Sequence, residues 1–275
     1  MNFRRTARRR LRTAATLVAS VLTLAGLAAA PANAAPVPTV VLVHGAFADA
    51  SGWTDVAAQL SASGYPVRTF DNPLRSPAGD ASRLTEFLAD IKGPIVLVGH
   101  SYGGAVITNT HDSDVRANVY IAAFAPAEGE FVQGLLNPVT YPGSRLLPPA
   151  LQLTSVPDGA SPVGANVDGY IAEEYFHEVF CQDVSAAVAA DMYAHQKSAA
   201  LAANLEPSGA PSWADTPSWY LISQQDRVIP PALQKMMAGR AAPGRTSEVD
   251  ASHVSLVSQP GRVADVVRAA ITATS

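Results

Sequence analysis

The sequence has 275 residues, of which 48% are hydrophobic and 15% charged; this composition excludes a largely disordered chain and supplies enough apolar residues for a full-sized core. Six of the 19 basic residues lie among the first 12 positions, so 13 basic and 23 acidic residues give the rest of the chain a net charge of about −10. This charge argues against nucleic acid or an anionic membrane as a partner.

Residues 1–34 have the pattern of a secretory signal peptide. A basic head is followed by an uncharged stretch, residues 13–30, and by small residues of the kind that precede a cleavage site. A retained membrane anchor is the alternative, because 18 uncharged residues are just long enough to cross a bilayer. The many Ala and Thr residues and the position of Pro31 favour cleavage, after Ala34 or Ala35. We therefore expect a secreted protein without stable membrane association.

Cys181 is the only cysteine, so the exported chain forms no internal disulfide bond and its fold must rest on its hydrophobic core. We expect a buried thiol at this position rather than a reactive one.

Residues 35–125 alternate between short apolar runs and stretches of helical periodicity. The strands are expected within 37–43 and at 65–70, 95–98 and 119–124, and the helices at 53–63, 80–91 and 102–110. Runs that are apolar on both faces and separated by helices predict a parallel sheet that is covered on both sides. The fold class is therefore α/β.

The pattern breaks between residues 126 and 214, where proline and glycine are dense before two helices expected at 172–180 and 184–196. A structureless loop of this length is unusual in a compact domain, so we interpret the segment as an inserted, mostly helical cap on a core of residues 35–125 and 215–275. The core resumes with strands at 219–223 and 246–249 and helices at 231–240 and 262–272, about six strands in all. We expect the cap to form the substrate pocket. It carries five aromatic residues that could serve as apolar walls, but aromatic residues at helical spacing more often form core, so the prediction concerns the region and not these residues: Tyr170, Tyr175, Phe176, Phe180 and Tyr193.

The segment from Gly99 to Gly103, GHSYG, fits the pattern G-x-S-x-G between a buried strand and a helix. In this motif the serine lies on a sharp turn, and glycines two residues to either side avoid collisions. A purely structural turn is the alternative reading. The pattern indicates Ser101 as a nucleophile.

A serine hydroxyl needs a base to take its proton and an acid to orient that base. His253 follows the last strand, and Asp226 follows the strand before it, which gives the chain order Ser, Asp, His. The competing acids are Glu128 and Glu130, after the fourth strand. We expect Asp226 to be the acid and His253 the base.

The oxyanion of the reaction needs two hydrogen-bond donors. The residue after the nucleophile provides one, the backbone N–H of Tyr102, and the loop after the first strand provides the other. Gly45 lets that loop turn inward, so Ala46 is the expected donor and Phe47 the less favoured one.

Other chemistries have weaker support in the sequence. Neither a P-loop nor a dinucleotide-binding glycine pattern can be found, and the one dense group of metal-binding residue types, residues 111–114, lacks helical ligand spacing. We expect no cofactor and no metal.

Five motifs, in this order and at these spacings, carry a family resemblance: VLVHGAF, GHSYGG, VYIAAFAP, SQQDRVIP and DASHVSL. They resemble an α/β-hydrolase of the group that includes plant methyl esterases, hydroxynitrile lyases and bacterial hydrolases. The resemblance implies Ser101, Asp226 and His253 as the triad and the amides of Ala46 and Tyr102 as the oxyanion hole.

The resemblance also separates sister chemistries. The lyases of this group carry a threonine where this chain has Gly45 and a lysine where it has Val254, and dehalogenases of the fold use an aspartate as nucleophile. These differences favour hydrolysis of a small or medium carboxylic ester, lactone or thioester. The alternatives are a cofactor-free perhydrolase, a lyase, or a non-catalytic protein that binds a small molecule. The sequence does not indicate an oligomeric state.

Overall fold

Six parallel strands form the central sheet, in the order β2-β1-β3-β4-β8-β9. The computed structural model describes Met1 and residues 36–158 and 164–275, so the expected signal peptide beyond Met1 lies outside the described residues. The strands are β1 (Thr39–Val43), β2 (Val67–Phe70), β3 (Ile95–His100), β4 (Val115–Ile121), β8 (Ser218–Ser223) and β9 (Thr246–Val249). Both the parallel sheet and its six strands were predicted.

The central strands β1, β3 and β8 are buried at every position, which explains why they are apolar on both faces. Register pairs such as Val41 with Leu97 align β1 beside β3. The fourth strand begins and ends earlier than its pattern predicts. It ends at Ile121 because the next residue, Ala122, takes a φ of 42°. The carboxyl ends of these strands all lie at one edge of the sheet.

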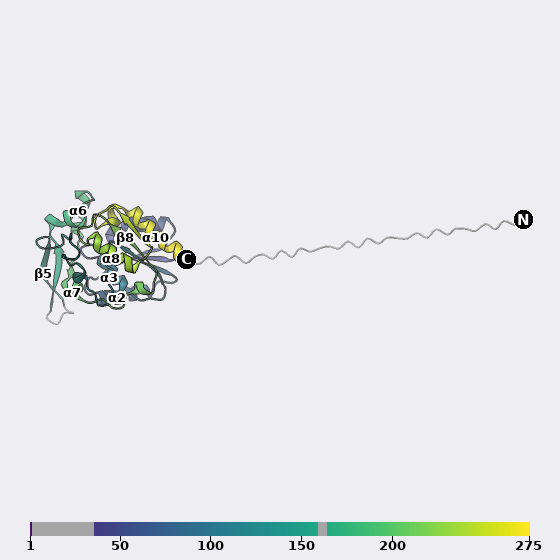
Figure 1. Cartoon of the computed structure of the whole chain (residues 1–275), viewed down its shortest axis with the longest axis horizontal. Coiled ribbons are helices and arrows are strands. Elements are labelled where there is room, and N and C mark those ends of the chain that lie inside the picture. The colour runs from purple at the N-terminus through teal and green to yellow at the C-terminus, as the bar shows by residue number, and fades with distance from the viewer. Residues whose placement is uncertain (2–35, 159–163) are drawn as a thin grey trace. The chain divides into compact units, whose positions relative to one another are not determined.

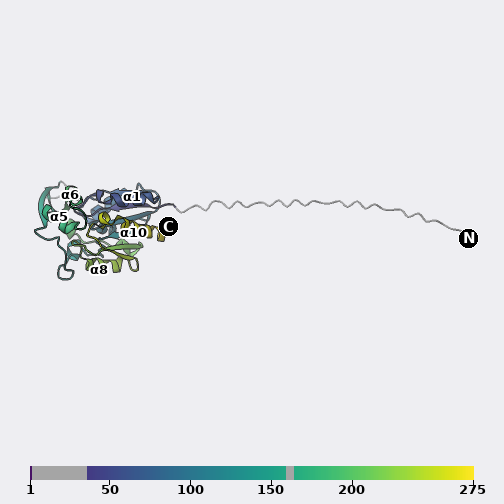
Figure 2. The same cartoon turned by 90° about the horizontal axis from the view of Figure 1, so that it is seen from above.

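Helices cover both faces of the sheet: α1 (Thr54–Ala62), α2 (Pro77–Leu88), α3 (Tyr102–Thr108), α8 (Pro231–Ala241), α9 (Ser255–Ser258) and α10 (Pro260–Thr274), with a 3₁₀ turn, η1 (Ala50–Trp53), before α1. Helix α1 packs against α10, and α2 packs against α3. Figure 2 shows α1 and α8 on opposite sides of the sheet. No helix in the described part of the chain has the length and apolar character needed to span a bilayer.

The insertion between β4 and β8 is not only helical. Its helices are α4 (Val132–Leu135), α5 (Glu173–Phe180), α6 (Ala186–Ala194) and α7 (Leu201–Leu205), and a 3₁₀ turn, η2 (Ser212–Ala214), ends it. A second, antiparallel sheet consists of β5 (Leu151–Pro157), β6 (Ala165–Ile171) and β7 (Ala199–Ala200). The expected helices are present as α5 and α6, but the sheet was not predicted. In Figure 1, β5, α6 and α7 lie at the edge of the folded unit opposite the C-terminus.

Residues 197–200 attach the insertion to the core. The backbone N–H of Ala200 donates to the carbonyl of Leu74 (3.0 Å), and the ammonium of Lys197 contacts Asp71 (2.5 Å). The guanidinium of Arg75 makes two hydrogen bonds to the buried carboxylate of Asp168, at 2.8 and 2.7 Å. This paired geometry is the strong form of an ion pair, so it fixes β6 against the loop after β2.

Candidate active site

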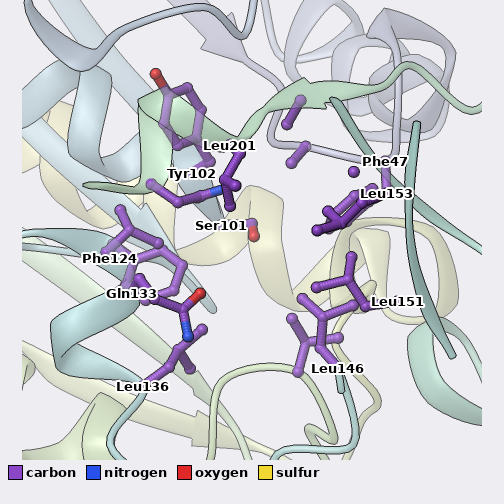
Figure 3. A pocket seen from close by; sticks show the side chains of 16 residues that line it. Phe47, Ser101, Tyr102, Phe124, Gln133, Leu136, Leu146, Leu151, Leu153 and Leu201 are labelled. Atoms are coloured by element: carbon purple, nitrogen blue, oxygen red, sulfur yellow. The ribbon is translucent and has the colours of Figure 1, made fainter. Parts of the chain in front are cut away.

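Ser101 lies on the sharp turn between β3 and α3 that the motif predicts. Its φ of 53° and ψ of −123° are in a region that non-glycine residues rarely occupy. The turn is held on both sides, because the carbonyl of Ser101 accepts hydrogen bonds from the N–H groups of Gly104 and Phe124, each at 3.0 Å. In this conformation Ser101 lines a pocket at the carboxyl end of β3 (Figure 3).

The flanking glycines are required for the predicted reason. A Cβ atom on Gly99 would lie 2.7 Å from the carbonyl oxygen of Gly103, and a Cβ atom on Gly103 would lie 2.5 Å from the carbonyl oxygen of Val43. Both contacts are with backbone, which cannot swing away. Glycine at position 99 therefore lets β3 approach the first turn of α3, and glycine at position 103 lets that turn approach the end of β1.

The substitution Gly103→Ala should destabilise the fold by about 1–3 kcal/mol, the usual cost of overpacking a tight core. Urea unfolding of the purified variant measures this loss. Gly239→Ala is the matched control, because a Cβ atom there meets nothing within 4 Å in the exposed part of α8. Alanine in the interior of a helix is favoured, so the control should gain up to about 1 kcal/mol. Equal stability of the two variants would contradict the close approach at Gly103.

His253 and Asp226 form a buried pair at the ends of β9 and β8. The Nδ1–H of His253 donates to Oδ2 of Asp226 at 2.7 Å, and both side chains are fully buried. The other carboxylate oxygen accepts the N–H groups of Val228 (2.7 Å) and Ile229 (2.9 Å). The carboxylate is thus fixed by backbone donors on one side, and it orients the imidazole on the other.

The ring of His253 is held from two directions. Its centroid lies 4.7 Å from that of His100 and 5.2 Å from that of Phe180, and its own carbonyl accepts a hydrogen bond from Nε2 of His100 at 2.9 Å. Nε2 of His253 is buried and has no hydrogen-bond partner among the described residues. Nε2 makes no hydrogen bond to Ser101. Catalytic hydrogen bonds of this kind often form only when substrate is bound. The free nitrogen can accept a proton.

The competing acids lie elsewhere. The carboxylate of Glu130 makes two hydrogen bonds to Arg240 and also accepts the N–H of Ala127 at 2.8 Å. Glu128 is exposed. Neither bonds His253, so the geometry favours Asp226.

Sequence reasoning missed Gln234, a fully buried residue of α8. Its Nε2–H₂ donates to Oδ2 of Asp226 and to the carbonyl of Ile229, both at 2.8 Å, while its Oε1 accepts the N–H of Ser223 at 3.1 Å. The side chain therefore links β8 to the carboxylate that orients His253. A polar residue on the buried face of a helix is the signal that could have identified it.

The two expected oxyanion donors are both free. Tyr102 is the first residue of α3, so its N–H has no acceptor within the helix. The N–H of Ala46 has no acceptor among the described residues, whereas the N–H of Phe47 donates to the carbonyl of Lys197 at 3.1 Å. The N–H of Phe47 is therefore occupied, and the N–H of Ala46 is the one available to an oxyanion.

The loop after β1 is pinned by His44. The N–H of Asn72 donates to Nε2 of His44 and Nδ1 of His44 contacts the carbonyl of Gly45, both at 2.9 Å. Because Nε2 accepts a hydrogen bond, the proton lies on Nδ1 and the ring is neutral. Burial lowers the pKa of His44, and it lowers the pKa of the fully buried His100 well below 6.5, with nearby His253 as the next cause.

These two neutral histidines should make the fold sensitive to mild acid. The unfolded chain takes up protons at both positions below a pH of about 6.5 and the native state does not, so stability is complete above that pH and falls as the pH drops below it. Each histidine contributes at most about 1.4 kcal/mol per pH unit. Urea unfolding between about pH 7.5 and 5.5 measures the slope. The variant His100→Asn should show a shallower slope than the parent, and identical slopes would contradict this account.

The side chain of Tyr102 is held by a hydrogen bond to α2. Its hydroxyl donates to Oδ2 of Asp80 at 2.9 Å, and both residues are buried. Burial raises the pKa of Asp80, and it raises the pKa of Tyr102 well above its ordinary value, with the charge of Asp80 as the second cause. This buried pair ties the first turn of α3 to α2.

Cys181 is also buried, as predicted, and burial raises the pKa of its thiol to about 12.

A largely apolar pocket opens directly above Ser101 (Figure 3). Phe124, Gln133 and Leu136 lie on one side of the serine, and Phe47, Leu146, Leu151 and Leu153 lie on the other. Ala46 and Tyr102, whose amides are the candidate oxyanion donors, also line the pocket. With its open mouth the cavity holds about 600 Å³, and no charged residue lines it.

None of the five aromatic residues named in the cap lines this pocket. Phe176 packs against Phe180 (5.0 Å between centroids) and Tyr193 (5.6 Å), inside the insertion. Aromatic residues at helical spacing thus form a local core, and leucines form the walls. Within the described residues, no group of three or more His, Cys, Asp or Glu side chains could hold a metal ion.

The comparison with protein families decides the classification. The model of the alpha/beta hydrolase family matches residues 40–266. The chain belongs to the alpha/beta hydrolase family. The expected fold and hydrolase class are therefore confirmed.

Relatives of this hydrolase include a pyrethroid hydrolase of Sphingobium wenxiniae, 28% identical over 259 residues, which cover 84% of this chain and 86% of the relative. A carbendazim hydrolyzing esterase of Nocardioides sp. is 34% identical over 111 residues, 35% of this chain and 46% of the relative. The crystal structure of polyneuridine aldehyde esterase matches with a TM-score of 0.72 and 17% identity, over 85% of this chain and 99% of that one.

Proposed function

We propose that this hydrolase is an exported enzyme that cleaves neutral carboxylic esters of small to medium size through an acyl-enzyme on Ser101. The observation that carries the proposal is the Asp226–His253 hydrogen bond of 2.7 Å, with a free Nε2, at the edge of the sheet where Ser101 lies beneath an uncharged pocket. The relatives named as a pyrethroid hydrolase and a carbendazim hydrolyzing esterase support the hydrolytic part.

The reaction proceeds in two stages. Oγ of Ser101 attacks the ester carbonyl while Nε2 of His253 takes its proton, and Asp226 holds the imidazolium that forms. The amides of Ala46 and Tyr102 bind the oxyanion, and the imidazolium then protonates the departing alcohol. Water that loses a proton to His253 releases the acid from Ser101. The chemistry needs no metal and no cofactor.

The pocket favours hydrolysis over the lyase chemistry of related proteins. A Cβ atom on Gly45 would lie 2.7 Å from Cβ of Ser101, so this loop has no room for the threonine that the lyases carry. Val254, at the position of their lysine, is buried. Lactones and thioesters present the same carbonyl to Ser101 and remain within the proposed substrate class.

A covalent trap tests the proposal. The protein without its leader should hydrolyse p-nitrophenyl butyrate, and a fluorophosphonate should abolish this activity and add one label, which peptide mass spectrometry locates on Ser101. Hydrolysis that continues after complete labelling would contradict the role of Ser101. Absence of both hydrolysis and labelling would favour a non-catalytic binding protein.

Export has a separate test. Expression of the full chain in a bacterial host should release a protein into the medium or periplasm whose first residue is Ala35 or Pro36, as N-terminal sequencing measures. Recovery of the intact chain from the membrane fraction would contradict cleavage.

A further inference from the structure

Exposed apolar side chains are concentrated in the insertion. Among the described residues, the large hydrophobic side chains that are more than a third exposed are Met1, Val37 and seven residues between 126 and 214: Phe131, Val139, Leu147, Leu153, Val167, Val188 and Leu205. The core, which is the larger part, contributes almost none. The question is whether any of these seven continue the pocket wall outward.

Two of the seven, Leu153 and Val167, lie on the face of the β5–β6 hairpin that lines the pocket. Leu151 and Leu153 line the pocket, and Leu153 pairs with Gly169. A Cβ atom on Gly169 would lie 3.3 Å from the side chain of Leu151 and 3.7 Å from that of Leu153, so the glycine leaves room for both leucines. Alternate residues of a strand share a face, so Val167 lies on the same face as Gly169. Leu153 is 54% exposed and Val167 is 42% exposed. The apolar wall therefore extends from the pocket onto the outer part of the hairpin.

Helix α7 repeats this arrangement. Leu201 lines the pocket, and Leu205, one turn further along the same helix face, is 50% exposed. Leu201 and Ser101 both line the pocket (Figure 3). We call Leu153, Val167 and Leu205 the apolar rim, because each continues a pocket-lining position toward solvent.

The elements around the pocket carry almost no charge. In α4, β5, β6 and α7 the single charged residue is Asp168, and its carboxylate is buried and paired with Arg75. By contrast, the neighbouring helix α5 carries Glu173, Glu174 and Glu178. Two acidic residues adjoin these elements: Glu206 follows α7 and bonds Ser76 and the N–H of Ala78, and Asp158 follows β5 and bonds Asn166. Because the elements that line the pocket expose no charge of their own, they do not favour an ionic partner.

We propose that the apolar rim docks this hydrolase on the surface of an aggregated, electrically neutral ester, such as an emulsion droplet, and passes single molecules from that surface to Ser101. The proposal rests on the proposed esterase function. The occupant follows from two features: the rim is continuous with the pocket wall, so what covers it can enter the pocket, and the three rim side chains are uncharged, so they match a neutral apolar surface rather than a charged one.

Adsorption can be measured without turnover. In the Ser101→Ala background, the pair Val167→Ser and Leu205→Gln should reduce the fraction bound to a tributyrin emulsion, measured by flotation, by at least about tenfold. Neither residue lines the pocket, and both are exposed, so the variant should keep the parent's melting temperature. The matched control is Val139→Ser with Leu147→Gln, two equally apolar exposed side chains outside the rim, which should bind as the parent does.

Turnover then separates this proposal from the esterase function. With an intact Ser101, the rim pair should cleave dissolved p-nitrophenyl butyrate within about twofold of the parent and emulsified tributyrin at least about tenfold more slowly. Equal adsorption of rim and control pairs would overturn the docking proposal. So would a dimer that only the rim pair dissociates in sedimentation, because a second copy would then cover the rim. A parent that adsorbs but cleaves neither ester would overturn the esterase function alone.

Discussion

The variant Ser101→Ala should lower kcat for a soluble ester by about 10⁶, the loss seen when the nucleophile of a serine triad is removed. The loss is large because the acyl-enzyme can no longer form, while Asp226, His253 and the two amides remain in place. A residual rate of about 10³ over water is expected from the oxyanion hole and binding. Steady-state hydrolysis of p-nitrophenyl butyrate, together with fluorophosphonate labelling, measures both effects.

The fold should not change in this variant. No hydrogen bond from the Ser101 hydroxyl is present among the described residues, so its loss leaves no buried partner unsatisfied. Ser223→Ala is the matched control, because that hydroxyl is also buried without a partner but lies at the end of β8. The control should retain activity within a few fold. If both variants were equally active, Ser101 would not be the nucleophile.

The variant Asp226→Asn should lower kcat by about 10⁴, since an amide cannot hold the imidazole in the required tautomer. In the native site Oδ2 of Asp226 accepts two donors, Nδ1 of His253 and Nε2 of Gln234. An asparagine that keeps its oxygen on Val228 and Ile229 presents its own N–H₂ to those donors. Nδ1 of His253 must then accept a hydrogen bond, which places the ring proton on Nε2. A protonated Nε2 cannot take the proton of the Ser101 hydroxyl.

The competing carboxylates supply the controls for this prediction. Glu128→Gln and Glu130→Gln should leave kcat within a few fold, although Glu130→Gln weakens the ion pair with Arg240. Single-turnover acylation, followed by stopped flow, separates a slower chemical step from weaker binding. Normal acylation in Asp226→Asn combined with its loss in Glu128→Gln would show that the other acid orients His253.

The core and the local geometry of the candidate site could be predicted from the sequence because their constraints are local. Strands such as β3 are buried along their whole length, so their apolar runs leave a clear pattern. The sharp turn at Ser101 needs glycine at fixed spacing. A Cβ atom on Gly103 would lie 2.5 Å from the carbonyl oxygen of Val43, so no residue with a side chain fits there. The positions of Asp226 and His253 follow because parallel strands bring their carboxyl ends to one edge.

The insertion was harder to predict because its contacts are not local. Strand β5 is exposed at most positions and follows a proline-rich stretch, so it leaves no buried apolar run. Its partner β6 is recognisable only once the antiparallel pairing is known. The roles of Gln234 and Asp80 depend on residues that are distant in the sequence or on another element, and helical periodicity carries no information about such partners.

The hydrogen bond from Phe47 to the carbonyl of Lys197 links the insertion to the catalytic loop. Phe47 has a φ of 61°, a costly conformation for a bulky residue, and it directly follows Ala46. Its backbone is therefore shaped by a segment of the insertion rather than by the core alone. In evolutionary terms the insertion is therefore not an independent module: a cap transplanted from a relative would need an equivalent of residues 197–200 to keep these contacts with the loops after β1 and β2.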